Sequence, residues 1–330
     1  MKYLIHNSLV QNSYWRLAAD NKRTKLVLII CLFVLVNTVT AETKNGFDLK
    51  GSLVPVEGIL RGGPPRDGIP AIDKPVFIKA ALATLAVNER IMGVHFKGVA
   101  RAYPIRILNR HEIVNDTFNQ TDVVVSYCPL CGSGVVFLWP QSERRNTFGV
   151  SGLLYNSDVL LYDRESESLW SQLMLKAISG SRRGETLTLL AATYTTWGEW
   201  QTRYPESLLL SEASAPGVSY HNNPYADYEK SEQLWFPVQH KSADLRNKER
   251  VLGLSINGVD KAYPYSELSR SKGTVDDVVG GQKIRIVWSE ASQSAYVLDS
   301  DGQQLPTVSA YWFAWFSFHP QTQVYRDSHQ

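Results

Sequence analysis

Short apolar segments separated by turn residues predict β-strands along much of this chain. The clearest case is residues 91–104 and 251–264, which each hold two such segments around a two-residue turn, Lys97-Gly98 or Asn257-Gly258. Asn-Gly is typical of a type I′ hairpin turn, because both positions need a positive φ. Each segment ends in Tyr-Pro, and proline ends a strand since it has no N–H to donate. We therefore predict two β-hairpins.

The two predicted hairpins indicate an internal repeat. Residues 91–104 and 251–264 are identical at six of fourteen positions without a gap. A repeat of this kind indicates copies of one structural unit. The similarity continues into the following segments. Matching strands are predicted at residues 123–127 and 135–137 and at 284–288 and 295–297, and matching short aromatic helices at residues 197–205 and 312–320.

We expect a β-rich α+β fold in which two related halves form one compact domain. The chain has 330 residues, of which 44% are hydrophobic and 20% charged, and this is an ordinary balance for a globular protein. The first repeat is predicted over residues 45–215. Residues 216–330 are predicted to hold a polar connector and a degenerate second repeat.

The N-terminal segment has the pattern of an export signal. Three basic residues precede an unbroken apolar run over residues 26–36, which is short for a bilayer span and typical of a signal-peptide core. Small residues before position 42 predict cleavage after Ala41, so residues 1–41 are the predicted signal peptide. We expect a periplasmic or secreted protein. The alternative is a membrane anchor formed by residues 26–36.

Charge argues against nucleic acid as a partner. Residues 1–41 hold five basic residues and one acidic residue, so their removal changes the net charge from +2 to −2. No basic face is left to bind a phosphate backbone. We expect the partner to be an unidentified small molecule or protein, with membrane contact only through an uncleaved signal segment.

The cysteines indicate a chemical site rather than a disulfide scaffold. Of the three cysteines, Cys31 lies in the predicted signal peptide, and Cys128 and Cys131 are only three positions apart. Cys128-Pro129-Leu130-Cys131-Gly132 between two predicted strands is typical of a metal knuckle, in which backbone N–H groups stabilise thiolates. The second repeat has Ser289-Glu290-Ala291-Ser292-Gln293 in the corresponding place. The turn itself therefore does not need cysteine.

A metal in this knuckle needs further ligands, because no second Cys-x-x-Cys pair exists. His111 is the first candidate, since the second repeat lacks both this histidine and the cysteines. We predict a site for zinc or copper held by Cys128, Cys131 and His111. His319 is a further candidate, and Glu112 a weaker one.

A third hairpin is predicted over positions 151–172, with residues 153–162 as its first strand. Several of its residues are candidates for acid–base or anion-binding roles. Asp158 and Asp163 are two carboxylates that could exchange protons, although turns also favour aspartate for local reasons. Arg164 could pair with them or bind an anionic ligand.

Two other functions compete with metal binding. One is a metal-free module that binds a small ligand or peptide, with a Cys128–Cys131 disulfide. The other is a thiol-disulfide oxidoreductase. Gly132-Ser133-Gly134 and a β-branched strand follow the cysteines, where a thioredoxin-like enzyme would begin a helix. The sequence leaves open whether the protein is an enzyme.

Six motifs of the chain occur together in one known family. They are Tyr127-Cys128-Pro129-Leu130-Cys131-Gly132 and the runs at residues 98–104, 111–116, 151–158, 168–172 and 312–320. In these motifs the chain resembles a bacterial and archaeal family whose members are described as domains of unknown function. The resemblance covers roughly residues 50–325 and implies an exported or membrane-associated domain, but no established activity.

Overall fold

The structure is a computed structural model that describes residues 43–139, 146–271 and 273–327. All of these residues belong to one of the two units into which the chain divides, Glu42–Gln330. The predicted signal peptide lies outside the described residues. Among the helices that are described, none has the length and apolar character needed to cross a membrane.

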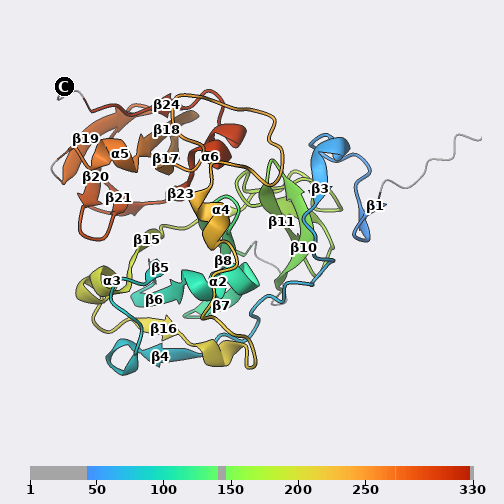
Figure 1. The fold of residues 1–330 in the computed structure, drawn as a ribbon, viewed down its shortest axis with the longest axis horizontal. Coiled ribbons are helices and arrows are strands. Elements are labelled where there is room, and N and C mark those ends of the chain that lie inside the picture. Colours follow the sequence, from blue (N-terminus) through green and yellow to red (C-terminus); the bar gives the residue numbers. More distant parts are fainter. Residues whose placement is uncertain (1–42, 140–145, 272, 328–330) are drawn as a thin grey trace, which may run out of the picture. The chain divides into compact units, whose positions relative to one another are not determined.

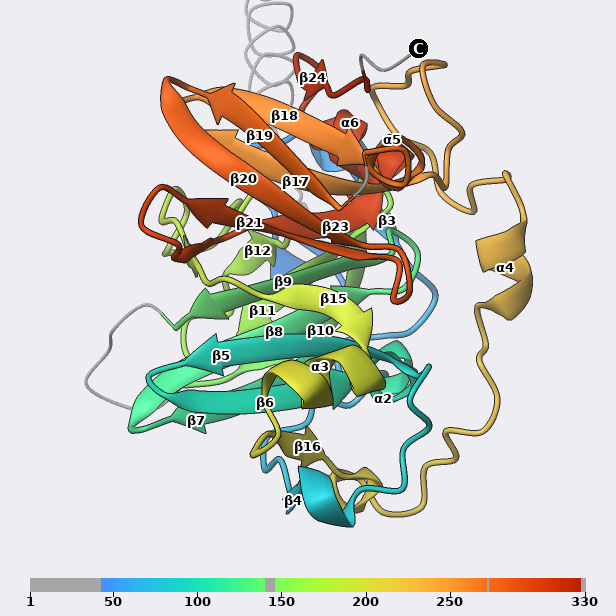
Figure 2. The same ribbon diagram turned by 90° about the vertical axis from the view of Figure 1, so that its left-hand side faces the viewer.

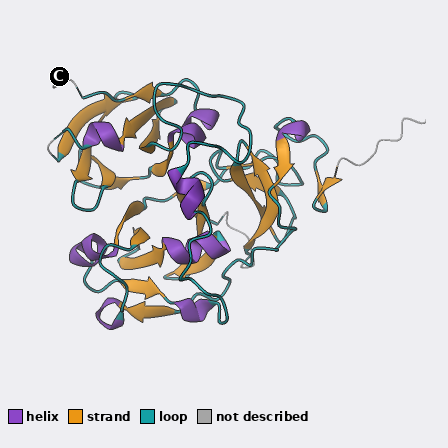
Figure 3. Ribbon diagram, viewed as in Figure 1, coloured by secondary structure: helices purple, strands orange, loops and turns teal. Residues whose placement is uncertain are grey.

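The described part of the chain is β-rich, with short helices between the strands (Figure 3). Its helices are α2 (Ile105–His111), α3 (Trp197–Arg203), α4 (Ala226–Lys230), α5 (Tyr265–Leu268) and α6 (Trp312–Phe318), with 3-10 turns at Val56–Gly58, Ala80–Leu82 and Glu212–Ser214. The prediction of a β-rich fold is confirmed.

Four sheets of four or more strands and one two-stranded ribbon contain the described strands (Figure 1). One sheet has the order β15 (Thr193–Thr196), β5 (Arg90–Phe96), β6 (Val99–Pro104), β16 (Leu208–Leu210), β4 (Phe77–Lys79). The largest has the order β24 (Gln323–Val324), β18 (Val259–Pro264), β17 (Arg250–Ile256), β23 (Val308–Tyr311), β9 (Ser133–Leu138), β8 (Thr121–Cys128), β7 (Ile113–Phe118), with β14 (Thr188–Leu189) paired to β9.

The remaining sheets are smaller. A four-stranded sheet has the order β19 (Thr274–Val279), β20 (Gln282–Ser289), β21 (Ser294–Asp299), β22 (Gln304–Leu305). A five-stranded sheet has the order β13 (Lys176–Ala177), β12 (Leu169–Ser171), β11 (Asp158–Asp163), β10 (Phe148–Tyr155), β3 (Ile59–Arg61). The ribbon is β1 (Thr43–Lys44) with β2 (Phe47–Asp48).

The two predicted hairpins are confirmed and have the same register. In β5–β6, Ile91 lies opposite Pro104, and in β17–β18, Val251 lies opposite Pro264. Both turns have positive φ at each position, 49° and 75° at Lys97-Gly98. A further strand pairs with each hairpin in the same way, β15 with β5 and β23 with β17.

Equivalent helices pack on the two hairpins through equivalent contacts. A Cβ added at Gly93 would lie 2.3 Å from a ring atom of Trp200, and one added at Gly253 would lie 2.2 Å from the same atom of Trp315. Each position therefore requires glycine, because the tryptophan ring lies directly on the strand backbone. α3 and α6, which carry these tryptophans, confirm the predicted aromatic helices.

A third region, β10–β13, lies between β9 and β14 in the chain. The strands that correspond in the second half, β21 and β22, are joined by a short turn at residues 300–303. The hairpin predicted over residues 151–172 needs a correction. Its first turn is Asn156-Ser157, both at positive φ, so Asp158 begins β11 instead of lying inside one long strand.

The two predicted halves, residues 45–215 and 216–330, contact each other at several places, and one strand pair joins them within a single sheet. Ser309 of β23 lies opposite Gly134 of β9, which joins strands of both halves into the largest sheet (Figure 2). The same core cluster contains Cys128 and Cys131 from the first half and Trp312 and Trp315 from the second. The cysteine turn therefore lies beside the junction between the halves.

Candidate functional site

The cysteine turn connects β8 to β9. Cys128 is the last residue of β8 and lies opposite Ser133, the first residue of β9. The backbone N–H of Cys131 donates to Cys128 Sγ at 3.4 Å. Gly132 has φ 56°, a conformation that favours glycine, and a Cβ there would lie 2.9 Å from the Tyr311 ring, so the space beside the ring excludes a larger residue unless that ring moves. The predicted turn between two strands is present, and among the described residues one backbone N–H, that of Cys131, donates to a cysteine sulfur.

The second half contains the same turn with serines. Ser289 lies opposite Ser294, and the N–H of Ser292 donates to Ser289 Oγ at 3.4 Å. Gln293 has φ 46° in the position of Gly132. Because the backbone takes the same course with Ser289 and Ser292, cysteine is not needed to form the turn.

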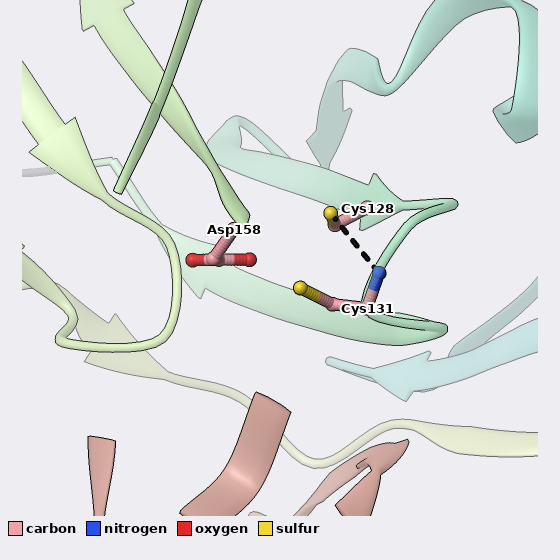
Figure 4. A group of neighbouring side chains, drawn as sticks. All are labelled: Cys128, Cys131 and Asp158. Carbon is pink, nitrogen blue, oxygen red and sulfur yellow. Dashed lines mark hydrogen bonds between the residues drawn. The ribbon is translucent and has the colours of Figure 1, made fainter. Parts of the chain in front are cut away.

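Asp158 joins the two cysteines from a different sheet. It is the first residue of β11, and its carboxylate lies beside both thiols (Figure 4). One ligand atom from each of Cys128, Cys131 and Asp158 lies within 4.8 Å of the others. All three residues are fully buried. The three side chains form what we call the Cys-Cys-Asp group, which has the donor set and spacing to hold one metal ion.

Hydrogen bonds satisfy only part of the Cys-Cys-Asp group. Asp158 Oδ2 accepts from the N–H of Leu173 at 3.0 Å. Asp158 Oδ1 is buried and has no hydrogen-bond partner among the described residues. The thiol of Cys131 donates to the carbonyl of Ser157 at 3.3 Å, and both thiols are free rather than joined in a disulfide. A buried carboxylate oxygen without a partner is costly, and a cation would remove that cost.

Burial favours the protonated form of each residue in the group when no cation is present. It raises the pKa of Asp158 to about 7, against the effect of the Leu173 N–H. It also raises the pKa of the Cys128 thiol, and that of the Cys131 thiol still more. A bound divalent cation acts in the opposite direction, because it favours the deprotonated form of each ligand.

Glu112 is a fourth acidic side chain beside the group. It is buried, and its pKa is raised to about 8, first by burial and then by the nearby Asp158 carboxylate. It follows α2 with φ 58°, a left-handed conformation that is rare outside glycine. Glu112 also lines a cavity of about 90 Å³ together with Leu130 and Trp235. Burial and the left-handed backbone make Glu112 a candidate site residue, whereas the sequence offered it only as a weak candidate.

His111 lies apart from the Cys-Cys-Asp group in this structure. Its Nδ1 is 2.7 Å from the carbonyl oxygen of Pro70, and its Nε2 is 2.7 Å from the Tyr220 hydroxyl. Burial lowers the pKa of the ring. Both nitrogens are engaged, so one hydrogen bond would have to break before His111 could bind a metal. Its predicted role as a ligand stays a prediction, and Asp158 occupies the third position in the observed geometry.

The other predicted residues have local partners away from the cysteines. His319 Nδ1 lies 3.0 Å from Asp260 Oδ2, and its ring stacks on Trp315. Asp163 accepts from the Trp170 indole N–H at 2.8 Å, and Arg164 donates to both carboxylate oxygens of Asp73 at 2.9 and 3.0 Å. Of the four candidates His319, Asp158, Asp163 and Arg164, Asp158 alone lies beside the cysteines.

The fold and the site define a β-rich domain with a buried thiol and carboxylate group at the junction of two halves. The chain belongs to the family described as "Protein of unknown function (DUF3179)", whose sequence profile matches residues 66–322. No curated protein and no solved structure matches the chain. The matched region contains both cysteines and Asp158.

Proposed function

We propose that this protein binds a transition-metal ion, with zinc favoured, through Cys128, Cys131 and Asp158. The observation that carries the proposal is the buried carboxylate of Asp158: its Oδ1 has no hydrogen-bond partner among the described residues, and one of its oxygens lies within 4.8 Å of both thiol sulfurs. Two thiolates and one carboxylate form three ligands, and zinc sites with three protein ligands keep a fourth position for water or substrate.

The choice of zinc follows from the donor atoms. Thiolates suit both zinc and Cu(I), whereas a carboxylate oxygen suits zinc better than the softer Cu(I) ion. Copper was an equal candidate when histidine was the expected third ligand. With Asp158 in that place, we expect copper to bind more weakly than zinc in a competition.

We also propose how the site arose and where the protein is located. The equal registers of β5–β6 and β17–β18, and the equal contacts of Trp200 and Trp315, support two copies of one ancestral unit. The first copy then acquired the cysteines and the β10–β13 region that carries Asp158. The apolar run before Ala41 supports export of the domain to the periplasm or beyond, with residues 1–41 removed.

A second candidate function is a dithiol–disulfide centre. Asp158, with a pKa of about 7, could accept the proton of a thiol as it attacks a disulfide of a partner. The partner would be reduced to a dithiol, and Cys128 and Cys131 would become the disulfide. Against this function, both thiols are fully buried and burial raises their pKa, which disfavours attack by a thiolate.

Elemental analysis separates the two candidates. Protein purified under reducing conditions and loaded with zinc should hold one ion per chain, and the Cys128→Ser and Asp158→Asn variants should hold none. Ser289→Ala changes the equivalent turn of the second half and serves as the matched control, with one ion retained. Absence of stoichiometric zinc, combined with rapid exchange of both thiols with a dithiol probe, would overturn metal binding in favour of the dithiol centre.

A further inference from the structure

A polar pocket lies beside the cysteine turn and is lined by residues of both halves. It has a volume of about 480 Å³, within the range of small-molecule sites. Residues of both halves line it, among them Arg90, Tyr127 and Tyr194 from the first and Arg250 and Tyr311 from the second. We call it the junction pocket. The family description gives this pocket no role, and the proposed metal site does not use its residues.

The two arginines of the junction pocket occupy equivalent positions. Arg90 begins β5 and Arg250 begins β17. Each reaches across to the turn of the other half: Arg250 Nη1 donates to the carbonyl of Gly132 at 2.9 Å, and Arg90 Nη1 to the carbonyl of Gln293 at 3.3 Å. The backbone oxygens hold one edge of each guanidinium in place but do not neutralise its charge.

No carboxylate within the described ranges forms an ion pair with Arg90 or Arg250. Buried phenols also surround Arg250, and burial raises the pKa of Tyr311 to about 12 and the pKa of Tyr127 well above its usual value, so both of these phenols are neutral. The Arg250 guanidinium also lies over the Tyr194 ring, 4.2 Å from its centroid. Neither arginine is therefore neutralised by a direct ion pair among the described residues.

The other charged groups of the pocket limit the charge of a ligand. Arg106 is paired with Glu212 at 2.9 Å, and the Lys248 ammonium donates to backbone carbonyls, including that of Gln233 at 3.0 Å. Glu89 and Glu229 also line the pocket and contribute negative charge. With Arg106 neutralised by Glu212, the positive charges of Arg90, Lys248 and Arg250 exceed those of the two glutamates by one. A ligand with one negative charge balances that excess, and a dianion such as phosphate does not.

We propose that the junction pocket binds a small organic monocarboxylate between Arg90 and Arg250. A guanidinium binds a carboxylate in a planar, two-bonded geometry. Tyrosine rings and Ile105 supply apolar surface for the body of the ligand. The pocket also touches the cysteine turn, since Tyr311 N donates to Cys131 O at 2.8 Å, but the proposal does not rest on metal binding.

Benzoate is a suitable probe, and benzamide is its uncharged counterpart of the same shape. Titration calorimetry of the mature chain at low ionic strength should give a Kd of about 1 mM or tighter for benzoate. Benzamide should bind at least about tenfold more weakly, because it lacks the charge that the arginines recognise. Inorganic phosphate should also bind more weakly than benzoate.

Variants connect the binding to the two arginines. Arg90→Gln and Arg250→Gln should each weaken benzoate binding about tenfold or more, and Arg250→Lys, which keeps the charge, should weaken it less. Arg285→Gln removes an exposed arginine paired with Asp276 and is the control, with unchanged binding. Arg90→Gln tests the proposal by itself should Arg250→Gln fail to fold.

Three results would overturn the proposal: no binding of benzoate, equal binding of benzoate and benzamide, or binding that is unchanged in Arg90→Gln. Tighter binding of phosphate than of benzoate would also overturn it, because the pocket would then select a different anion. Zinc content measured on the same variants should stay at that of the unchanged protein. Benzoate binding by the unchanged protein in the absence of bound zinc would count against the metal site and not against this one.

Discussion

The turn at residues 128–133 and the turn at residues 289–294 have the same backbone and different chemistry. Both connect two antiparallel strands in the same register, and in both the fourth residue donates its N–H to the side chain of the first, at 3.4 Å. In one turn those side chains are thiols, and in the other they are hydroxyls. The backbone of this turn therefore forms with either thiols or hydroxyls, and the thiols are not needed for it.

The surroundings of the two turns differ as much as their side chains. The β10–β11 hairpin carries Asp158 to the first turn, where it is buried with the thiols. The second turn has no such hairpin, and Ser292 Oγ instead donates to the carboxylate of Glu199 on α3. The proposed metal site therefore depends on two features that distinguish the first turn from the second, the two cysteines and the hairpin that carries Asp158.

The largest difference between the turns should appear in metal content. Asp158→Asn should reduce bound zinc from one ion per chain to none, because the amide replaces the only carboxylate ligand. Plasma emission spectroscopy after dialysis measures it. Retention of a full equivalent of zinc by Asp158→Asn would show that another residue, His111 among them, completes the site.

The tryptophans that pack on Gly93 and Gly253 should contribute equally and strongly to the stability of the folded chain. Trp200→Ala and Trp315→Ala should each lower the free energy of unfolding by about 3–5 kcal/mol, because each removes a buried ring. Urea unfolding of both variants measures it. Values that differ by more than about twofold would break the equivalence of the two halves.

The stability of the folded chain should depend on pH through Glu112 in the first half, without an equivalent contribution from Glu267 in the second. The pKa of Glu112 is about 8 in the folded chain, against about 4.3 in an unfolded chain. Protonated Glu112 therefore favours the folded state, fully below about pH 4, and this contribution is lost as the pH rises through 8. Relative to Glu112→Gln, the metal-free protein should lose stability between about pH 4 and 8.

Urea unfolding with chelator and reductant present, at several pH values, measures that difference between the protein and Glu112→Gln. Glu267→Gln in the second half is the control, since Glu267 is buried but paired with Arg270 and Arg326. A constant stability difference between the protein and Glu112→Gln across this pH range would show that Glu112 is solvated.

The smallest effect should come from grafting the thiols alone. Ser289→Cys with Ser292→Cys reproduces the cysteines in the second turn, where no aspartate lies beside them. We expect less than about 0.1 equivalent of additional zinc after dialysis, because two thiolates without a third protein ligand bind weakly. A second full equivalent of zinc would show that the turn by itself is a sufficient site.

Much of the scaffold could be predicted from local patterns. Lys97-Gly98 and Asn257-Gly258 identified two hairpins, and the spacing of Cys128 and Cys131 identified the turn. α2 was not predicted, and the strand boundaries around Asp158 were wrong, because Asn156-Ser157 is a weaker turn signal than Asn-Gly. Glu112 and Asp158 were ranked below His111, since no sequence pattern shows how deeply a carboxylate is buried.

The sequence by itself determined the local structure: hairpin turns, paired strands and the two thiols held three residues apart. These features depend on backbone conformation and on neighbours along the chain. The tertiary structure alone decided the third partner of the thiols. Asp158 reaches Cys131 because the β10–β11 hairpin packs into the same core cluster as the turn, and burial of apolar residues far apart in the chain directs that packing. The same long-range packing engages His111 with Pro70 and Tyr220 instead of the cysteines.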